Sequence, residues 1–214
     1  MPKAATKTSL TAHGNPLSPG PGSGDVNICY QPAWRALPAG VGGGIETASN
    51  AAKAIMDSPQ LRPPDAVAKL TEINQGLSQA AGAAAGAGNA AAVAATSSAL
   101  AGLTTANAAL ATAYTAAASS GPEPAAAEAY AKGLQGAVSA AAAAAVSAIA
   151  AMTDLHNCSA PCPVGPHGPG VVTKGSSSVF INKLPASREQ DKVFEAAGGP
   201  DPINKGAPTV NIGG

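Results

Sequence analysis

The sequence predicts an α+β protein: a small pseudo-threefold β cone of short strands, interrupted by an alanine-rich α-helical insertion. Alanine supplies 53 of the 214 residues and concentrates in the middle of the chain. A short motif of glycine, valine and isoleucine recurs in both flanks. Two phenylalanines, one tryptophan and three tyrosines are too few for the core of one conventional globule of this length. We therefore expect two unlike parts.

Composition divides the chain into three segments. Residues 1–35 are rich in glycine and proline, and we assign them to the first repeat of the cone. Residues 36–152 form the helical insertion, since alanine is the best helix former and supplies 35 of the 72 residues from 79 to 150. Residues 153–214 return to glycine, proline, valine and threonine and hold the second and third repeats.

Start and stop signals divide the insertion into helices. Two prolines precede Asp65, Asn89 can cap a helix, and Gly121 is followed by a proline. The predicted helices cover 45–57, 65–85, 89–121 and 123–152.

The helical insertion could instead associate with a membrane. No charged residue occurs between Glu72 and Glu123, or between Lys132 and Asp154, and either stretch is long enough to span a bilayer. However, leucine, isoleucine and valine are sparse, and polar residues interrupt the first stretch. Soluble helices are the favoured interpretation. A membrane-active or chaperone-sheltered hairpin, formed by 79–121 and 133–153, is the alternative.

The flanks contain a repeat with the frame G-x-x-x-V-x-I-x-x-x-P-A-x-R. It occupies 22–35 and 175–188, and a third copy at 206–214 stops after the isoleucine and two glycines. Valine and isoleucine two residues apart point to the same side of a strand. Three such pairs predict one narrow core, and we expect Cys29, inside the first copy, to pack there. A β unit this small usually needs an additional stabilising cross-link.

The positions of the histidines and cysteines indicate that a metal ion provides this cross-link. His13 and His167 lie nine and eight residues before the first and second repeats, and each precedes a glycine. His156, Cys158 and Cys162 lie just upstream of His167. Three histidines and one cysteine would form a closed tetrahedral site suited to one structural Zn²⁺. The spacing leaves open whether Cys158 or Cys162 binds.

These residues resemble the PAAR-repeat family, the tip proteins of type VI secretion and related contractile injection systems. The family motif is present as Pro-Ala-Trp-Arg at 32–35 and Pro-Ala-Ser-Arg at 185–188, and the runs 153–182 and 198–203 also look like that family. The resemblance implies a β cone with a zinc near its tip, held by three histidines and one cysteine. Residues 4–13 resemble the prePAAR motif, which supports His13 as a ligand.

The chain departs from the family in three places. The long insertion follows the first repeat. Thr6 and Ser9 replace an arginine and an aspartate of the prePAAR motif. Ala196 and Ala197 stand where the family often has its cysteine, so Cys158 or Cys162 must substitute.

The resemblance implies a non-enzymatic structural role. The cone would cap a trimeric VgrG-type spike protein and puncture the target membrane, with an effector or a chaperone as a further partner. The alternatives are a membrane-inserting translocation module and a zinc hydrolase. The hydrolase is disfavoured because four protein ligands close the site and Asp154 is the only acid expected nearby.

Charge and targeting signals limit the possible partners and the cellular compartment of the protein. Twelve basic residues balance twelve acidic ones, which argues against a nucleic-acid partner. The N-terminus has two lysines but no apolar segment behind them, so we expect no secretory signal peptide. An odd cysteine count argues against a disulfide scaffold. We expect synthesis in the cytoplasm and secretion by the injection apparatus to the extracellular space or the target cell.

Overall fold

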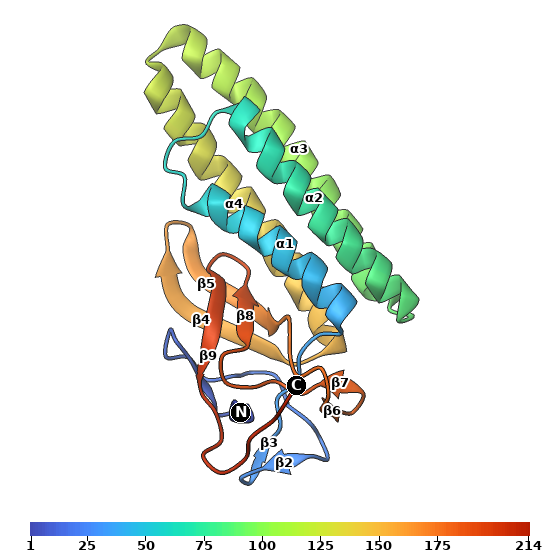
Figure 1. Ribbon diagram of the computed structural model, residues 1–214. Coiled ribbons are helices and arrows are strands. Elements are labelled where there is room, and N and C mark those ends of the chain that lie inside the picture. The colour runs from blue at the N-terminus through green and yellow to red at the C-terminus, as the bar shows by residue number, and fades with distance from the viewer.

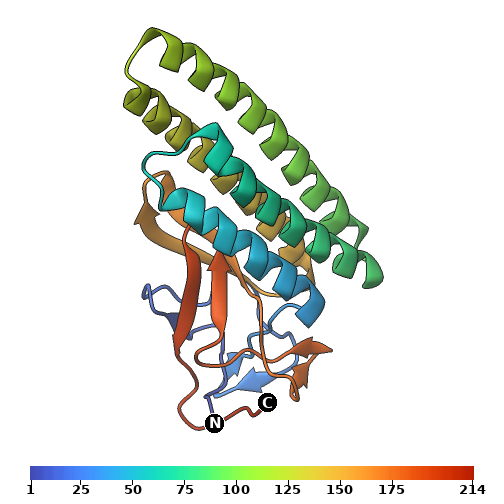
Figure 2. The same cartoon turned by 45° about the horizontal axis from the view of Figure 1, so that its top comes forward.

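Four helices stand beside a curled antiparallel sheet in the computed structural model, which describes residues 1–214 (Figure 1). The α+β class predicted from the sequence is confirmed. The helices gather at one end of the molecule, and both termini lie at the opposite end, among short strands (Figure 2). The helices are α1 (Ala39–Met56), α2 (Pro63–Gly86), α3 (Ala90–Ser120) and α4 (Glu123–Ile149), followed by a 3-10 turn (Ala150–Met152).

The helix signals in the sequence are confirmed, with one difference. Pro63 starts α2, and the Asn89 side chain accepts a hydrogen bond from the Ala92 amide at 3.0 Å. The first helix begins at Ala39, six residues before its predicted start, and so includes the glycine-rich residues 40–44. Glycine disfavours a helix by about 1 kcal/mol per residue, so tertiary contacts must stabilise this segment.

Close packing of α1 on α2 supplies those contacts. A Cβ added to Gly44 would lie 2.5 Å from the Ala80 amide nitrogen, and one added to Gly76 would lie 2.6 Å from that of Ala48. The two backbones therefore touch at a crossing that only glycine permits. Gly42 likewise lies against the backbone of Thr173, which joins α1 to the strand region.

Helices α3 and α4 differ in how far they are buried. Only four of the 31 residues of α3 are buried, whereas α4 packs one apolar face, including Leu134 and Val138, into the interior. The segment Glu123–Met152 has a mean hydropathy of 1.6 and is long and apolar enough to cross a membrane. Buried core helices of soluble proteins meet the same criterion, so this is weak evidence.

The main sheet has five antiparallel strands in the order β1-β9-β8-β5-β4. The strands β4 and β5 are eight residues each, longer than the short strands that the sequence predicted. In their pairing His156 lies opposite Gly170, and Cys158 opposite Gly168. The bounds are β1 (Leu10–Thr11), β4 (Leu155–Cys162), β5 (Gly165–Val172), β8 (Lys192–Glu195) and β9 (Gly199–Lys205).

The first two repeat copies each form a two-stranded hairpin. These are β2 (Asn27–Ile28) with β3 (Gln31–Pro32), and β6 (Phe180–Ile181) with β7 (Leu184–Pro185). The turn residues adopt positive φ, including 50° at Cys29 and 52° at Asn182. The prediction that Cys29 packs in the core is wrong, because this turn leaves it exposed.

The valine and isoleucine residues of the three repeat copies meet in one small core. Ile181 and Ile212 are buried there with four alanines, and Val26, Ile28, Val179 and Val210 pack against them. A second small core surrounds the fully buried Trp34. The largest core lies among the helices and continues into the sheet through Val171 and Phe194.

The arginine that ends each complete repeat reaches back to the glycine that begins it. Arg35 donates to the Gly22 carbonyl at 2.9 Å, and Arg188 lies 3.4 Å from the Gly175 carbonyl. Arg35 also forms a bidentate ion pair with the buried Asp154, at 2.7 and 2.9 Å. This pair joins the two ends of the helical insertion.

Candidate metal centre

The candidate metal ligands come from four strands and one loop. His156 and Cys158 are two residues apart on β4, so both side chains point to its buried face. His167 lies on the neighbouring β5, and Glu195 ends β8. His13 follows β1, and its backbone amide donates to Asp201 of β9 at 3.2 Å. The sheet thus gathers residues from both sides of the insertion.

One group of ligand atoms comprises His13, Cys158, His167 and Glu195, all within 4.8 Å of one another. The Cys158 sulfur lies 3.6 Å from Nδ1 of His13 and 3.8 Å from Nδ1 of His167. An oxygen of Glu195, Oε2, lies 2.7 Å from Nδ1 of His167 and 3.3 Å from Nδ1 of His13.

A second group comprises His156, Cys158, Glu195 and Asp201, also within 4.8 Å of one another and all buried. Nδ1 of His156 lies 2.9 Å from the Pro16 carbonyl, which only accepts hydrogen bonds. Nδ1 therefore carries the proton, and Nε2 of a neutral ring presents its lone pair. That atom lies 3.5 Å from Oε1 of Glu195.

Two buried polar atoms in these groups lack a close partner: Nε2 of His156 and Oε1 of Glu195. Oδ2 of Asp201, also buried, lies 2.9 Å from Nδ1 of His13. A buried acceptor without a partner costs free energy, and a cation between such atoms removes that cost. Gly198 lies against the same place, because an added Cβ would be 2.5 Å from Oε2 of Glu195 and closer still to the His167 ring. These residues therefore fit a metal ion.

The electrostatics of the cluster are consistent with this fit. Burial alone would raise the pKa of Glu195, but the contacts of its carboxylate with His156, Cys158, His167 and His13 lower it to about 2. Burial, together with the neighbouring carboxylates of Glu195 and Asp201, raises the pKa of the Cys158 thiol to about 12. Cys158 would therefore have to lose its thiol proton in order to hold a metal ion.

The structure places four of the five predicted site residues in the cluster. Cys158 belongs to both groups, and each of the three histidines shares a group with it. Cys162 lies outside both groups, partly buried, on the wall of a cleft. Of the two cysteines that the sequence left open, Cys158 has its sulfur in these groups, because β4 turns this side chain inward and carries Cys162 to its end.

Two cluster residues were missed by the sequence reasoning. Glu195 and Asp201 are fully buried acids, in the runs Lys-Val-Phe-Glu and Gly-Gly-Pro-Asp-Pro. The signal for Glu195 was an acid at the end of an apolar run. The expectation that Asp154 is the acid nearest the metal is wrong, since its carboxylate is held by Arg35.

A cleft of about 600 Å³ lies between the helices and the strand region beside the candidate metal cluster. Lys53 of α1 and Lys132 of α4 line one side, and Cys162, His167 and Gly198 line the other. The cluster therefore lies on the part of the sheet that faces the bundle, and His167 is its point of contact with the cleft.

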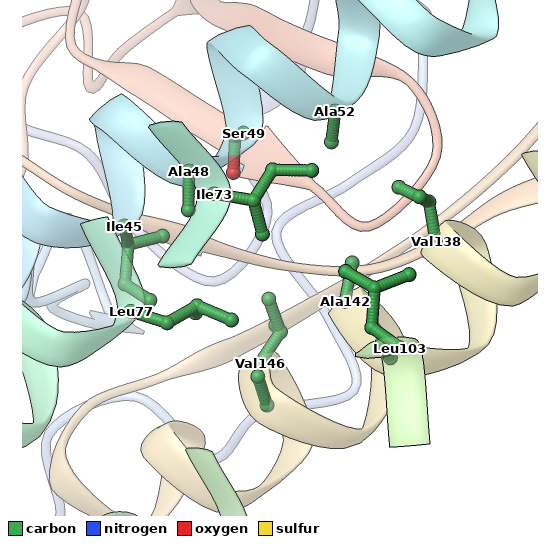
Figure 3. Close-up of a pocket in the computed structure, with 12 residues that line it drawn as sticks. Ile45, Ala48, Ser49, Ala52, Ile73, Leu77, Leu103, Val138, Ala142 and Val146 are labelled. Carbon is green, nitrogen blue, oxygen red and sulfur yellow. The ribbon is translucent and has the colours of Figure 1, made fainter. Parts of the chain in front are cut away.

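A second cavity lies inside the bundle and is apolar. Eleven of its twelve lining residues are hydrophobic, and it offers about 30 Å³ of space. In Figure 3, side chains such as Ile73, Leu77 and Val146 project into this space, and Ser49 supplies the one labelled polar atom. The cavity is a packing void left by small alanine side chains, with no group for chemistry.

Comparison with known proteins found no match among protein-family models, curated proteins or solved structures.

Proposed function

We propose that the protein is the structural tip of a contractile injection spike of the type VI kind, a PAAR-like cone that caps a trimeric VgrG-type protein. The observation that carries this proposal is the convergence of three repeat copies on one small core of valine and isoleucine side chains. A chain with this threefold internal repeat can match the end of a trimeric partner, since each copy can face one subunit.

The repeat hairpins supply the surface for that partner. Tyr30, in the turn of the first hairpin, is 98% exposed, and Phe180 of the second is 56% exposed. Exposed aromatic residues are typical anchors of protein interfaces. The hairpins lie at the end of the molecule that carries both termini (Figure 2). This end would seat on the spike.

Zinc would strengthen the cone. His13, His167 and Cys158 would hold it, with His156 and Glu195 as the two candidates for the fourth position. The ion would act as a structural cross-link in the manner of closed zinc sites. His13 precedes the insertion and Cys158 follows it, so these ligands would join segments that are 145 residues apart.

A structural role is favoured over zinc hydrolysis. Glu195 and Asp201 could serve a hydrolase as bases, but both are buried, as are His156 and Cys158. Only His13 and His167 retain exposed side-chain area, 33% and 13%. A substrate would therefore reach little of the cluster.

A translocation module is the second candidate function. It is favoured by the long apolar segment Glu123–Met152 and by α3, which has four buried residues among 31 and no charge. This helical pair would contact a chaperone before secretion and the target membrane afterwards. Partition of the protein into liposomes of anionic and neutral lipids tests it, and protein that stays wholly in solution would remove this candidate.

Co-purification with a trimeric VgrG-type protein tests the tip proposal. We expect one chain per trimer. The Tyr30→Ala and Phe180→Ala variants should lose binding, because each removes an exposed aromatic side chain from the seating surface. Val67→Ala is the matched control, since Val67 is 55% exposed but lies on α2. Equal binding by all variants, or no complex with the unaltered chain, would contradict the proposal.

A further inference from the structure

Glu195 occupies an unusual position in the metal cluster. It ends a strand whose preceding residues Val193 and Phe194 are buried, and its own side chain has no exposed area. Its carboxylate lies within 3.5 Å of a ring nitrogen of each of the three histidines. A buried carboxylate in so apolar a strand needs polar partners, and the chain places the three imidazoles and the Cys158 thiol beside it.

The two oxygens of Glu195 face different histidines. Oε2 lies 2.7 Å from Nδ1 of His167 and 3.3 Å from Nδ1 of His13. Oε1 faces Nε2 of His156 at 3.5 Å. His156 is therefore on the far side of the carboxylate from the other two rings, and it shares no group of mutually close ligand atoms with them.

The distances within the first group fit a tetrahedral metal site. Bonds of 2.0–2.3 Å at tetrahedral angles imply separations of about 3.3 to 3.6 Å between ligand atoms. The Cys158 sulfur is 3.6 and 3.8 Å from the nitrogens of His13 and His167. Oε2 of Glu195 is 3.3 Å from the His13 nitrogen, and only its 2.7 Å approach to His167 must lengthen when a metal enters.

Gly198 independently indicates that Oε2 and the His167 ring converge. A Cβ at this position would be 2.5 Å from Oε2 and would also strike the ring. The carboxylate and the imidazole thus share this space only because residue 198 is a glycine. This is the place where the sequence lacks the cysteine expected from the PAAR resemblance, since Ala196 and Ala197 precede it.

We propose that Glu195 is the fourth ligand of the metal, through Oε2, together with His13, His167 and Cys158. His156 is a positioning residue: its Nδ1 is anchored on the Pro16 carbonyl, and its ring restricts the rotation of the Glu195 carboxylate by contact with Oε1. This inference rests on the proposed zinc site and revises its ligand set from three histidines and one cysteine to two histidines, one cysteine and one carboxylate. The thiolate and the carboxylate together balance the charge of a divalent ion.

The test measures metal affinity of the full chain by chelator competition with Zn²⁺ and by the visible spectrum with Co²⁺. We expect Glu195→Gln to weaken Zn²⁺ binding more than 100-fold and to change the Co²⁺ spectrum, because a direct ligand is lost. His156→Gln should weaken binding by about 10-fold and leave the Co²⁺ spectrum nearly unchanged, as expected for a residue that orients a ligand. Glu195→Asp should recover part of the affinity.

Controls separate ligation from folding. Glu189→Gln makes the same chemical change outside the cluster and should bind Zn²⁺ like the unaltered chain. Circular dichroism of each metal-free variant reports its fold, and Gly198→Ala provides a second variant that should weaken binding with Glu195 intact. Threefold or smaller loss in Glu195→Gln, with loss above 100-fold in His156→Gln, would overturn this inference alone. Absence of metal binding by the unaltered chain would overturn the zinc site as well.

Discussion

The ion pair between Arg35 and Asp154 should be a main determinant of stability. Asp154 has no exposed side-chain area and Arg35 has 16%. The carboxylate also accepts from the Arg35 backbone amide at 3.0 Å, and Thr153 donates to the Arg35 carbonyl at 2.8 Å. The perturbation is Asp154→Asn, which keeps the shape and removes the charge.

The expected loss follows from this burial. Removing one partner of a buried ion pair costs about 3 to 5 kcal/mol, and the partly exposed Arg35 favours the lower value. At about 2 to 4 °C per kcal/mol for a chain of this size, Tm should fall by about 6 to 12 °C. Thermal unfolding followed by circular dichroism measures it.

Asp57→Asn is the matched control, because Asp57 pairs with Lys53 at 2.9 Å but both side chains are mostly or half exposed, at 62% and 44%. Such a surface pair contributes about 0 to 1 kcal/mol. The double variant Arg35→Met with Asp154→Leu should recover much of the lost stability, since it removes both charges. Equal melting temperatures for Asp154→Asn and Asp57→Asn would refute the reasoning.

Three further predictions concern the metal, the helix crossing and the void. A chelator should lower the Tm of the unaltered chain and of Cys162→Ser, but not the Tm of Cys158→Ser, as measured by calorimetry. An equal effect on all three proteins would contradict Cys158 as the metal ligand. Gly76→Ala should destabilise by about 1 to 3 kcal/mol through its clash with α1, whereas Gly82→Ala, which meets nothing within 4 Å, should stabilise by about 0.4 to 1 kcal/mol. Val138→Ile should fill the void of about 30 Å³ and raise stability by about 0.7 kcal/mol in urea titrations; a loss would mean that the void is already closed.

Local signals account for much of the helical insertion. Asn89 caps α3 and Pro63 starts α2 as predicted, because capping and ring geometry act within a few residues. The start of α1 was misplaced because its glycines are helical only through their contact with α2 and Thr173. A sequence pattern cannot predict this contact, because the contacting residues are far apart in the chain.

The site was predictable only in part. The three histidines and the Cys158–Cys162 pair were visible as rare residue types near the repeats, but their distances were not. Glu195 escaped notice because its one local sign, an acid at the end of a short apolar run, is too weak to single out one of twelve acidic residues. Its role follows from strand pairing, which sets β8 beside β5.

The sequence by itself determined the α+β class, the helices and the repeat, because these depend on local propensity and on side-chain periodicity. The tertiary structure decided which side chains form each group of candidate metal ligands, which cysteine points inward and where the helical insertion packs on the strands. It did so because a metal site needs atoms within a few ångströms of one another. Here His13 and Cys158, 145 residues apart, meet at 3.6 Å, and only long-range strand pairing and the Arg35–Asp154 junction bring them together.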